Sequence, residues 1–160
     1  MWWRLTRAEY RKNAGQANKR AFKKIVEGGA MPGVLAYDGD RPVGWCAVEP
    51  KSAYPSLLRS KAKTVDDQAC WSVPCFFVAK SHRGRGVSAA LLAAATRHAR
   101  ANGATLIEGY PIDTDKRAVD FSAFVGAAQI FREAGFTEAA RPSPSRPVMR
   151  LAMTKGGRRG

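Results

Sequence analysis

Residues 83–88 combine two arginines with two glycines in a pattern suited to binding phosphate. They read Arg-Gly-Arg-Gly-Val-Ser. Gly84 and Gly86 allow backbone dihedrals that a side chain forbids and let a ligand come close to the main chain. A helix that starts here directs its free amides and positive dipole end toward the turn, and Arg83 and Arg85 can each meet phosphate oxygens with two hydrogen bonds. The alternative interpretation is a tight strand-to-helix turn in which the glycines only relieve steric strain.

The residues on either side of this turn change from a strand pattern to a helix pattern. Phe76, Phe77 and Val78 are aromatic or β-branched and favour a strand. Residues 89–95 are rich in Ala and Leu, which favour a helix. We therefore expect a strand over residues 70–79 and a helix over residues 88–102. Because Pro74 has no N–H to donate, the strand should part from one neighbour at that point.

The glycine turn resembles the coenzyme-binding motif of the GNAT superfamily of N-acetyltransferases, which is Gln or Arg, two residues, Gly, one residue, then Gly or Ala. Ser88 stands where the family has Gly or Ala. The resemblance implies that backbone amides of the turn bind the pyrophosphate of acetyl-CoA and that the preceding strand pairs with the pantetheine arm. The coenzyme-binding residues that it implies are Phe76, Phe77, Val78, Arg83, Gly84, Arg85, Gly86, Val87 and Ser88.

The order of the expected elements extends this resemblance from about residue 6 to residue 153. The elements are a helix (7–27), a hairpin (33–37 and 42–48), the strand 70–79, the helix 88–102, a strand (105–110), a helix (118–134) and two strands (136–140 and 148–153). The family's first strand is missing or reduced to residues 2–5. The resemblance implies an α/β fold, with a mixed sheet and a splayed central strand pair. We expect one domain over residues 1–154 and a basic, disordered tail over residues 155–160.

A dinucleotide-binding domain is the competing interpretation of the same glycines. Gly84, Gly86 and Ala89 fit its spacing, and Glu108 lies near the distance expected of a ribose-binding acid. A doubly wound domain would continue with further βα units after this turn. Only about fifty residues follow Glu108, and they do not read as repeated βαβ units.

Acyl transfer from a thioester to an amine needs an oxyanion donor, a base for the amine and a proton for the thiolate. By resemblance, a backbone amide near Phe77 or Val78 supplies the first. Glu108 is the first candidate base, because its strand should border the cleft, and Tyr110 lies on the same face and could donate a proton. The alternative for Glu108 is a structural acid paired with a nearby arginine.

Other side chains are weaker catalytic candidates. Glu49 and Asp113, at the ends of neighbouring strands, follow Glu108 as possible bases. Many GNAT members carry a tyrosine on the late helix that protonates the thiolate, and an asparagine seven residues earlier. Phe131 and Phe124 stand at those positions, so neither usual side chain is available. Cys75 adjoins the thioester strand, but we interpret it as a buried, inert thiol.

Composition limits the class of protein more than its function. With 160 residues and 45% apolar side chains, the chain is expected to form a single globular domain. Three cysteines without metal or disulfide spacing predict reduced thiols and no metal site. The absence of a signal-like segment predicts a cytoplasmic location. The net charge of +14 is concentrated in residues 1–28 and 141–160, at +6 each. We interpret both segments as solvated basic surface, and nucleic-acid binding is a less favoured alternative.

These observations predict an acetyl-CoA-dependent N-acetyltransferase that acts on a primary amine by direct transfer in a ternary complex. The acceptor is a small-molecule or peptide amine, no membrane is involved, and a homodimer is possible by resemblance. A non-catalytic acyl-CoA-binding module, suggested by Phe124 and Phe131, is the first alternative. A basic nucleic-acid-binding protein is the second. The polar stretch 50–68 is either a lid over the acceptor site or a surface loop, with a short helix around residues 56–60.

Overall fold

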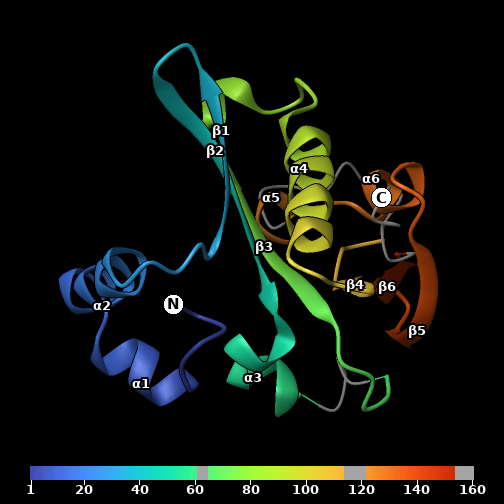
Figure 1. Cartoon of the computed structure of the whole chain (residues 1–160), viewed down its shortest axis with the longest axis horizontal. Coiled ribbons are helices and arrows are strands. Elements are labelled where there is room, and N and C mark those ends of the chain that lie inside the picture. The colour runs from blue at the N-terminus through green and yellow to red at the C-terminus, as the bar shows by residue number, and fades with distance from the viewer. Residues whose placement is uncertain (61–64, 114–121, 154–160) are drawn as a thin grey trace, which may run out of the picture.

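The strand that precedes the glycine turn lies in the middle of a six-stranded sheet with the order β1-β2-β3-β4-β6-β5. We describe a computed structural model that covers residues 1–60, 65–113 and 122–153 (Figure 1). The strands are β1 (Gly33–Asp38), β2 (Arg41–Pro50), β3 (Trp71–Val78), β4 (Leu106–Gly109), β5 (Thr137–Ser143) and β6 (Arg146–Ala152). The helices are α1 (Arg7–Lys12), α2 (Gln16–Glu27), α3 (Pro55–Leu58), α4 (Val87–Ala101), α5 (Ser122–Val125) and α6 (Ala128–Glu133).

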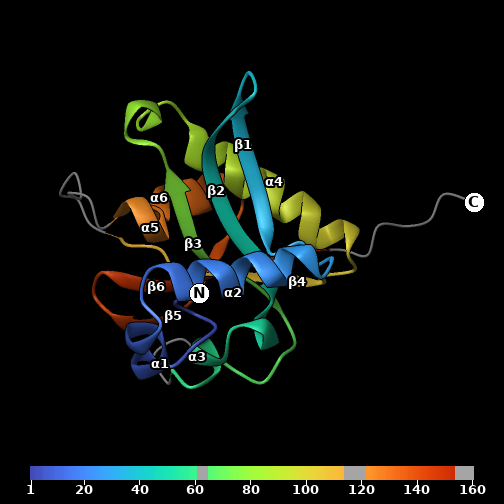
Figure 2. The same ribbon diagram turned by 90° about the vertical axis from the view of Figure 1, so that its left-hand side faces the viewer.

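Helices cover both faces of the sheet. Figure 2 shows α2 in front of β1–β3 and α4 behind them. Alternate residues of β2 and β3, including Cys46 and Phe76, pack with Leu91 and Leu92 of α4 in the main core. Trp45 faces the other way and lies edge-on to Phe22 of α2, with ring centroids 5.9 Å apart. The fold is therefore the expected α/β fold with a mixed sheet.

Among the described strands, β3 and β4 are the one parallel pair of neighbours, and they separate along their length. β3 and β4 pair at Trp71–Ile107, Ser72–Glu108 and Val73–Gly109. β4 ends there, whereas β3 continues to Val78 while paired with β2. The separation begins at Pro74, as expected from its missing N–H. The predicted splay is confirmed, and the antiparallel neighbours exclude a doubly wound sheet.

The N-terminal region is divided where the sequence pattern predicts one continuous helix. Thr6 caps the start of α1, since its side chain accepts from the amide of Glu9 while the Glu9 carboxylate accepts from the amide of Thr6. Gly15, with φ of 75°, interrupts the helix after Asn13, and α2 starts at Gln16. In the described N-terminal residues the first strand is β1, so the missing first strand is confirmed.

The C-terminal half corrects two expectations. α5 and α6 are separate helices, because Gly126 between them has φ of 77°, and residues 118–121 of the expected helix lie outside the described residues. Phe124 is 50% exposed and Ala127 is also exposed, so neither side chain belongs to the core. The strand expected over residues 136–140 is longer, because residues 141–143 also belong to β5.

Other expectations fall on residues that the structure covers only in part. The short helix in the stretch 50–68 is present as α3, while residues 61–64 lie outside the described residues, so the lid remains a prediction. The predicted tail, 155–160, also lies outside them. Within the described ranges, none of the helices is long and apolar enough to cross a membrane.

Gly109→Ala should lower the free energy of unfolding by about 1–3 kcal/mol, the usual cost of overpacking a core. A Cβ at Gly109 would overlap the ring of Phe131, which is fully buried. Urea denaturation measures the change. In a Phe131→Leu background the same substitution should cost less than half as much, because the shorter side chain leaves room for the methyl group. An equal cost in both backgrounds would contradict this packing.

Candidate active site

The turn between β3 and α4 has the backbone conformation that its glycines permit. Gly84 and Gly86 have φ of 73° and 78°, in the region that favours glycine. Gly86 caps α4 without a side-chain hydrogen bond, so the first amides of the helix keep free donors. A Cβ at either glycine would meet no atom within 4 Å, so the space beside the turn is open. This geometry suits an anion such as a phosphate.

The other predicted turn residues do not all face that space. Arg83 donates from Nε to the carbonyl oxygen of Val78 at 3.2 Å, which closes the turn onto the end of β3. Arg85 is exposed at the turn. The side chain of Val87 packs toward Gly44 of β2, so only its main chain could reach a ligand. The phosphate contacts themselves remain predictions.

Strand alternation determines which amides of β3 face the gap left by β4. The amide of Ala79, just after β3, donates to the carbonyl of Val43 in β2, at 2.8 Å, so Phe77 also directs its N–H and C=O toward β2. The main-chain groups of Phe76 and Val78 then point to the opposite, open edge. Of the two amides expected as oxyanion donors, Val78 faces the gap and Phe77 does not.

A cavity of about 770 Å³ reaches the sheet where β3 and β4 separate. Pro74 and Cys75 of β3 and Tyr110, just after β4, form part of its wall. The remaining lining residues come from the N-terminal segment, α5 and the β5–β6 hairpin: Met1, Trp2, Trp3, Arg7, Tyr10, Phe124, Val125, Pro142, Ser143, Arg146, Pro147 and Val148. Its volume lies within the usual range for small-molecule sites.

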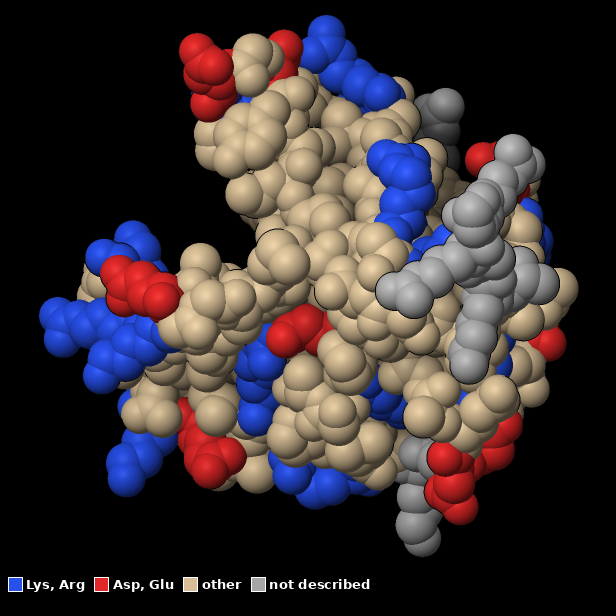
Figure 3. All heavy atoms as spheres, viewed as in Figure 1, with Lys and Arg blue, Asp and Glu red and all other residues tan. Residues whose placement is uncertain are grey.

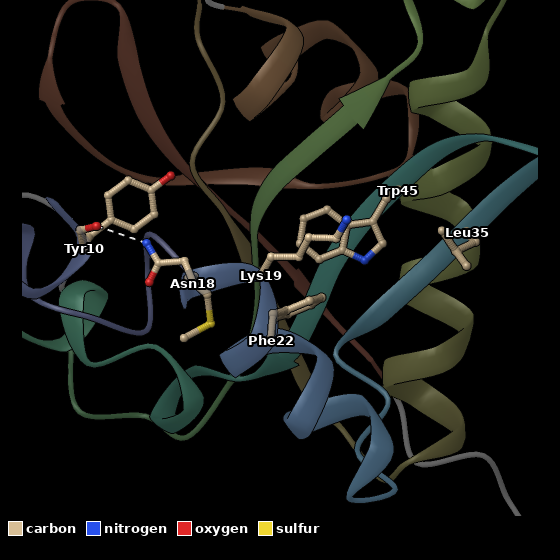
Figure 4. A pocket seen from close by; sticks show the side chains of 7 residues that line it. Tyr10, Asn18, Lys19, Phe22, Leu35 and Trp45 are labelled. Atoms are coloured by element: carbon tan, nitrogen blue, oxygen red, sulfur yellow. Dashed lines mark hydrogen bonds between the residues drawn. The ribbon is translucent and has the colours of Figure 1, made fainter. Parts of the chain in front are cut away.

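A second cavity of about 440 Å³ lies between α2 and the β1–β2 hairpin and shares Met1 and Tyr10 with the first. The surface is hollowed on this side, next to the lysines and arginines of α2 (Figure 3). Figure 4 shows Phe22, Leu35 and Trp45 along the cavity, with Asn18 at one end. Asn18 donates to the carbonyl of Tyr10 at 3.0 Å and is 8% exposed. Its Oδ1 accepts no hydrogen bond from the residues that the structure describes.

Glu108 is fully buried in a cluster of charges at the paired end of β3 and β4. Its Oε1 accepts from Nζ of Lys51 at 2.7 Å and from the hydroxyl of Tyr110 at 2.6 Å. Its Oε2 accepts from Nε of Arg150, also at 2.7 Å. Arg150 then binds Asp66 with both terminal nitrogens, at 2.7 and 2.8 Å. The alternative expectation, an acid paired with an arginine, is therefore confirmed, and its role as a base stays a prediction.

Tyr110 connects this cluster to the cavity. Its ring lines the cavity, while its hydroxyl donates to Glu108 and lies 3.2 Å from Oγ of Ser72. Burial, and then the negative charge of Glu108, raise the pKa of Tyr110 far above its ordinary value. A phenol with a raised pKa is a weaker proton donor, so the contacts favour a positioning role for Tyr110.

The other candidate acids also have cationic partners. Glu49 pairs with Arg4 and accepts from the hydroxyl of Tyr54 at 3.4 Å. Asp113 binds Arg132 at 2.6 Å and Arg141 at 2.7 Å. None of the described acids lines the larger cavity. These pairs explain why acids at strand ends, although plausible from the sequence, do not point into the site.

The two phenylalanines at the family's tyrosine and asparagine positions have different environments. Phe131 is buried edge-on between Phe76 and Phe136, at centroid distances of 6.1 and 5.1 Å. It therefore belongs to the core. Phe124 is half exposed and lines the cavity, where it contributes apolar surface.

Sequence reasoning missed the aromatic residues at the N-terminus. Trp2 and Trp3 both line the cavity, and Trp2 is 41% exposed. Trp2 also lies edge-on to Tyr10 of α1, with ring centroids 5.1 Å apart. The signal that could have found them is the pair itself, because two adjacent tryptophans rarely fit into one small core.

Comparison with known proteins identifies this arrangement. A family model, described as the acetyltransferase (GNAT) family, matches residues 1–126. No curated protein matches the sequence. A structure assigned to the GNAT family from Desulfovibrio desulfuricans matches with a TM-score of 0.55 at 19% identity, over 90% of this chain and 88% of that one. The polyamine N-acetyltransferase of Drosophila melanogaster, which forms N-acetylagmatine, matches with a TM-score of 0.57 at 17% identity, over 87% and 82%. The NatC complex bound to Gag peptide and CoA matches with a TM-score of 0.55 at 14% identity, over 84% and 79%.

The ion pair of Asp66 should make stability depend on acid pH. Hydrogen bonds from Arg150 lower the pKa of Asp66 from 3.8 to about 2. A lowered pKa means that the ionised form stabilises the fold above about pH 4, and that this contribution is lost as the pH falls toward 2. In urea unfolding between pH 4 and 2, wild type should lose stability faster than Asp66→Asn. Asp67→Asn is the matched control and should keep the wild-type slope, and equal slopes for all three proteins would contradict the expectation.

Proposed function

Because this chain belongs to the GNAT acetyltransferase family, we propose that it transfers an acetyl group from acetyl-CoA to a primary amine by direct attack within a ternary complex. The observation that carries the proposal is the separation of β3 and β4 after Val73 and Gly109. It leaves an open strand edge between the glycine turn, whose geometry suits an anion, on one side and a cavity of about 770 Å³ on the other.

Each part of the coenzyme has a counterpart in this arrangement. The amides from Gly84 to Ser88 would bind the pyrophosphate, since the turn has positive-φ glycines and uncapped helix amides. The pantetheine arm carries amide groups, which would pair with the main chain of Phe76 and Val78 at the open edge of β3. The Val78 amide would then lie next to the thioester and stabilise the oxyanion.

Direct transfer is favoured over an acetyl-cysteine intermediate. Cys75 lines the cavity and is the cysteine next to the gap. Burial raises the pKa of its thiol to about 11, so the thiolate needed for attack is scarce at neutral pH. An amine acceptor needs no such intermediate, because it can attack the thioester itself once it is neutral.

Glu108 and Tyr110 would act together at the closed end of the strand pair. Glu108 accepts hydrogen bonds from the charged side chains of Lys51 and Arg150, and it also accepts one from the hydroxyl of Tyr110. We propose that this cluster fixes the position of the Tyr110 ring against the acceptor. Proton removal by Glu108 itself would compete with the hydrogen bonds from its three close partners, which stabilise the carboxylate and weaken it as a base.

Gly86→Ala should weaken binding of acetyl-CoA about tenfold or more, equivalent to 1.4 kcal/mol, and lower kcat/KM with any accepted amine. The added methyl group would occupy the space proposed for the pyrophosphate and strain a φ of 78°. Gly103→Ala is a matched control, because Gly103 has φ of 83° and open surroundings at the other end of α4. Calorimetric titration and a chromatographic assay of CoA release measure both effects.

The outcomes of that experiment separate the candidate functions. Equal losses of affinity in the two variants would contradict the assignment of the turn. Coenzyme binding without turnover on a broad amine panel would favour the non-catalytic module. Salt-sensitive binding to nucleic acid without coenzyme binding would favour the basic nucleic-acid-binding protein.

Tyr110→Phe should lower kcat by less than about tenfold, because it keeps the ring and removes only the hydroxyl bound to Glu108. Loss of a general acid would instead cost about a hundredfold or more. The free energy of unfolding should fall by about 1.5–3 kcal/mol, the usual range for a hydrogen bond to a charged group. Steady-state kinetics and urea denaturation test the two effects. A hundredfold loss of kcat would contradict the positioning role and indicate that Tyr110 is the proton donor.

A further inference from the structure

The cavity of about 770 Å³ differs chemically between its floor and its rim. Pro74, Cys75 and Tyr110, next to the separating strands, are buried or half-buried. Arg7 and Arg146, on the N-terminal segment and the β5–β6 hairpin, are exposed. A molecule bound here would therefore meet apolar groups near the reacting centre and positive charge farther out.

Aromatic side chains form the wall between the floor and the rim. Trp2 and Tyr10 meet edge to face, at 5.1 Å and 84°. The guanidinium of Arg7 lies 5.7 Å from the ring centroid of Trp2. Stacking uses the face of a guanidinium and leaves its N–H groups at the edge able to bind an anion. The wall therefore suits a flat, apolar body and orients Arg7 toward an anionic group.

The charges of the cavity do not suit a polycation. Its described lining residues include two arginines and no acid. The nearby acids Glu49, Glu108 and Asp113 already bind lysine or arginine side chains. A second ammonium group on the acceptor would face Arg7 and Arg146 without a carboxylate among the described residues to bind it.

We propose that the acceptor is a primary amine joined through an aromatic or similarly apolar body to an anionic group such as a carboxylate. This inference rests on the proposed N-acetyltransferase function. The amine lies at the floor beside Cys75 and Tyr110, the body packs between Trp2, Tyr10 and Phe124, and the anion binds Arg7 and Arg146 at the rim. The preference is opposite to that of an enzyme for polyamines or agmatine.

Three acceptors of one shape test the charge preference. 4-(Aminomethyl)benzoate carries an anion opposite the amine, 4-methylbenzylamine carries no second charge, and 1,4-bis(aminomethyl)benzene carries a second ammonium group. kcat/KM should be highest for the benzoate and lowest for the diamine, with up to about fivefold between neighbours, as expected for one exposed charge pair worth up to about 1 kcal/mol. Agmatine should be a poor acceptor.

Charge-reversed variants assign that preference to the rim. Arg7→Glu and Arg146→Glu should each reduce the ratio of benzoate to diamine by about fivefold or more. Arg100→Glu makes the same change of charge on the exposed side of α4, outside the cavity, and should leave the ratio nearly unchanged. A preference for the diamine, or an equal effect of Arg100→Glu, would overturn the proposal.

Binding measured without turnover separates this inference from the proposed function. Because Trp2 and Trp3 line the cavity, quenching of tryptophan fluorescence should report binding of the same three compounds. Tighter binding of the benzoate, reversed by Arg146→Glu, without any CoA release would support the rim assignment and contradict the transferase. CoA release with a preference for the diamine would support the transferase and contradict the rim assignment. Neither binding nor turnover of any of the three compounds would overturn the inference.

Discussion

The separation of β3 from β4 is the constraint on which the rest of the structure depends. The two strands pair only from Trp71 to Val73, and Pro74, which has no N–H, lies where the pairing stops. The main-chain groups of Phe76 and Val78 then face no strand on that side. The carbonyl of Val78 accepts from Arg83, whereas an amide left unpaired and buried at this edge costs about 1–3 kcal/mol until a ligand or water accepts from it. A ligand with its own amides is the natural partner for it.

The closed end of this strand pair is held by charge. Glu108 of β4 binds Lys51, which follows β2, and Arg150 of β6, so one carboxylate links three parts of the sheet. Asp66 extends the cluster to the loop before β3 through Arg150. Removing one member of such a buried group costs about 3–5 kcal/mol, because the others are left unpaired. The same cluster positions Tyr110 in the cavity wall, and fold and site therefore share it.

The sequence was informative where one residue type has one physical consequence. Gly84 and Gly86 predicted the turn, and Pro74 predicted the separation of the strands. Side-chain roles were harder to predict, because they depend on contacts between distant segments. The residues near Glu108 in the chain do not predict its ion pairs with Lys51 and Arg150, which lie 57 and 42 residues away. The cavity likewise joins Trp2 to Arg146, and no local pattern could bring those two residues together.

A crystal structure with bound acetyl-CoA tests the central claim most directly. The account predicts that the pyrophosphate lies within hydrogen-bond distance of the amides between Gly84 and Ser88. It also predicts that the pantetheine arm pairs with Phe76 and Val78 and that the acetyl group lies between the Val78 amide and the cavity. Coenzyme bound at another site would contradict the account. So would a structure at saturating coenzyme in which no pantetheine lies in the gap between β3 and β4.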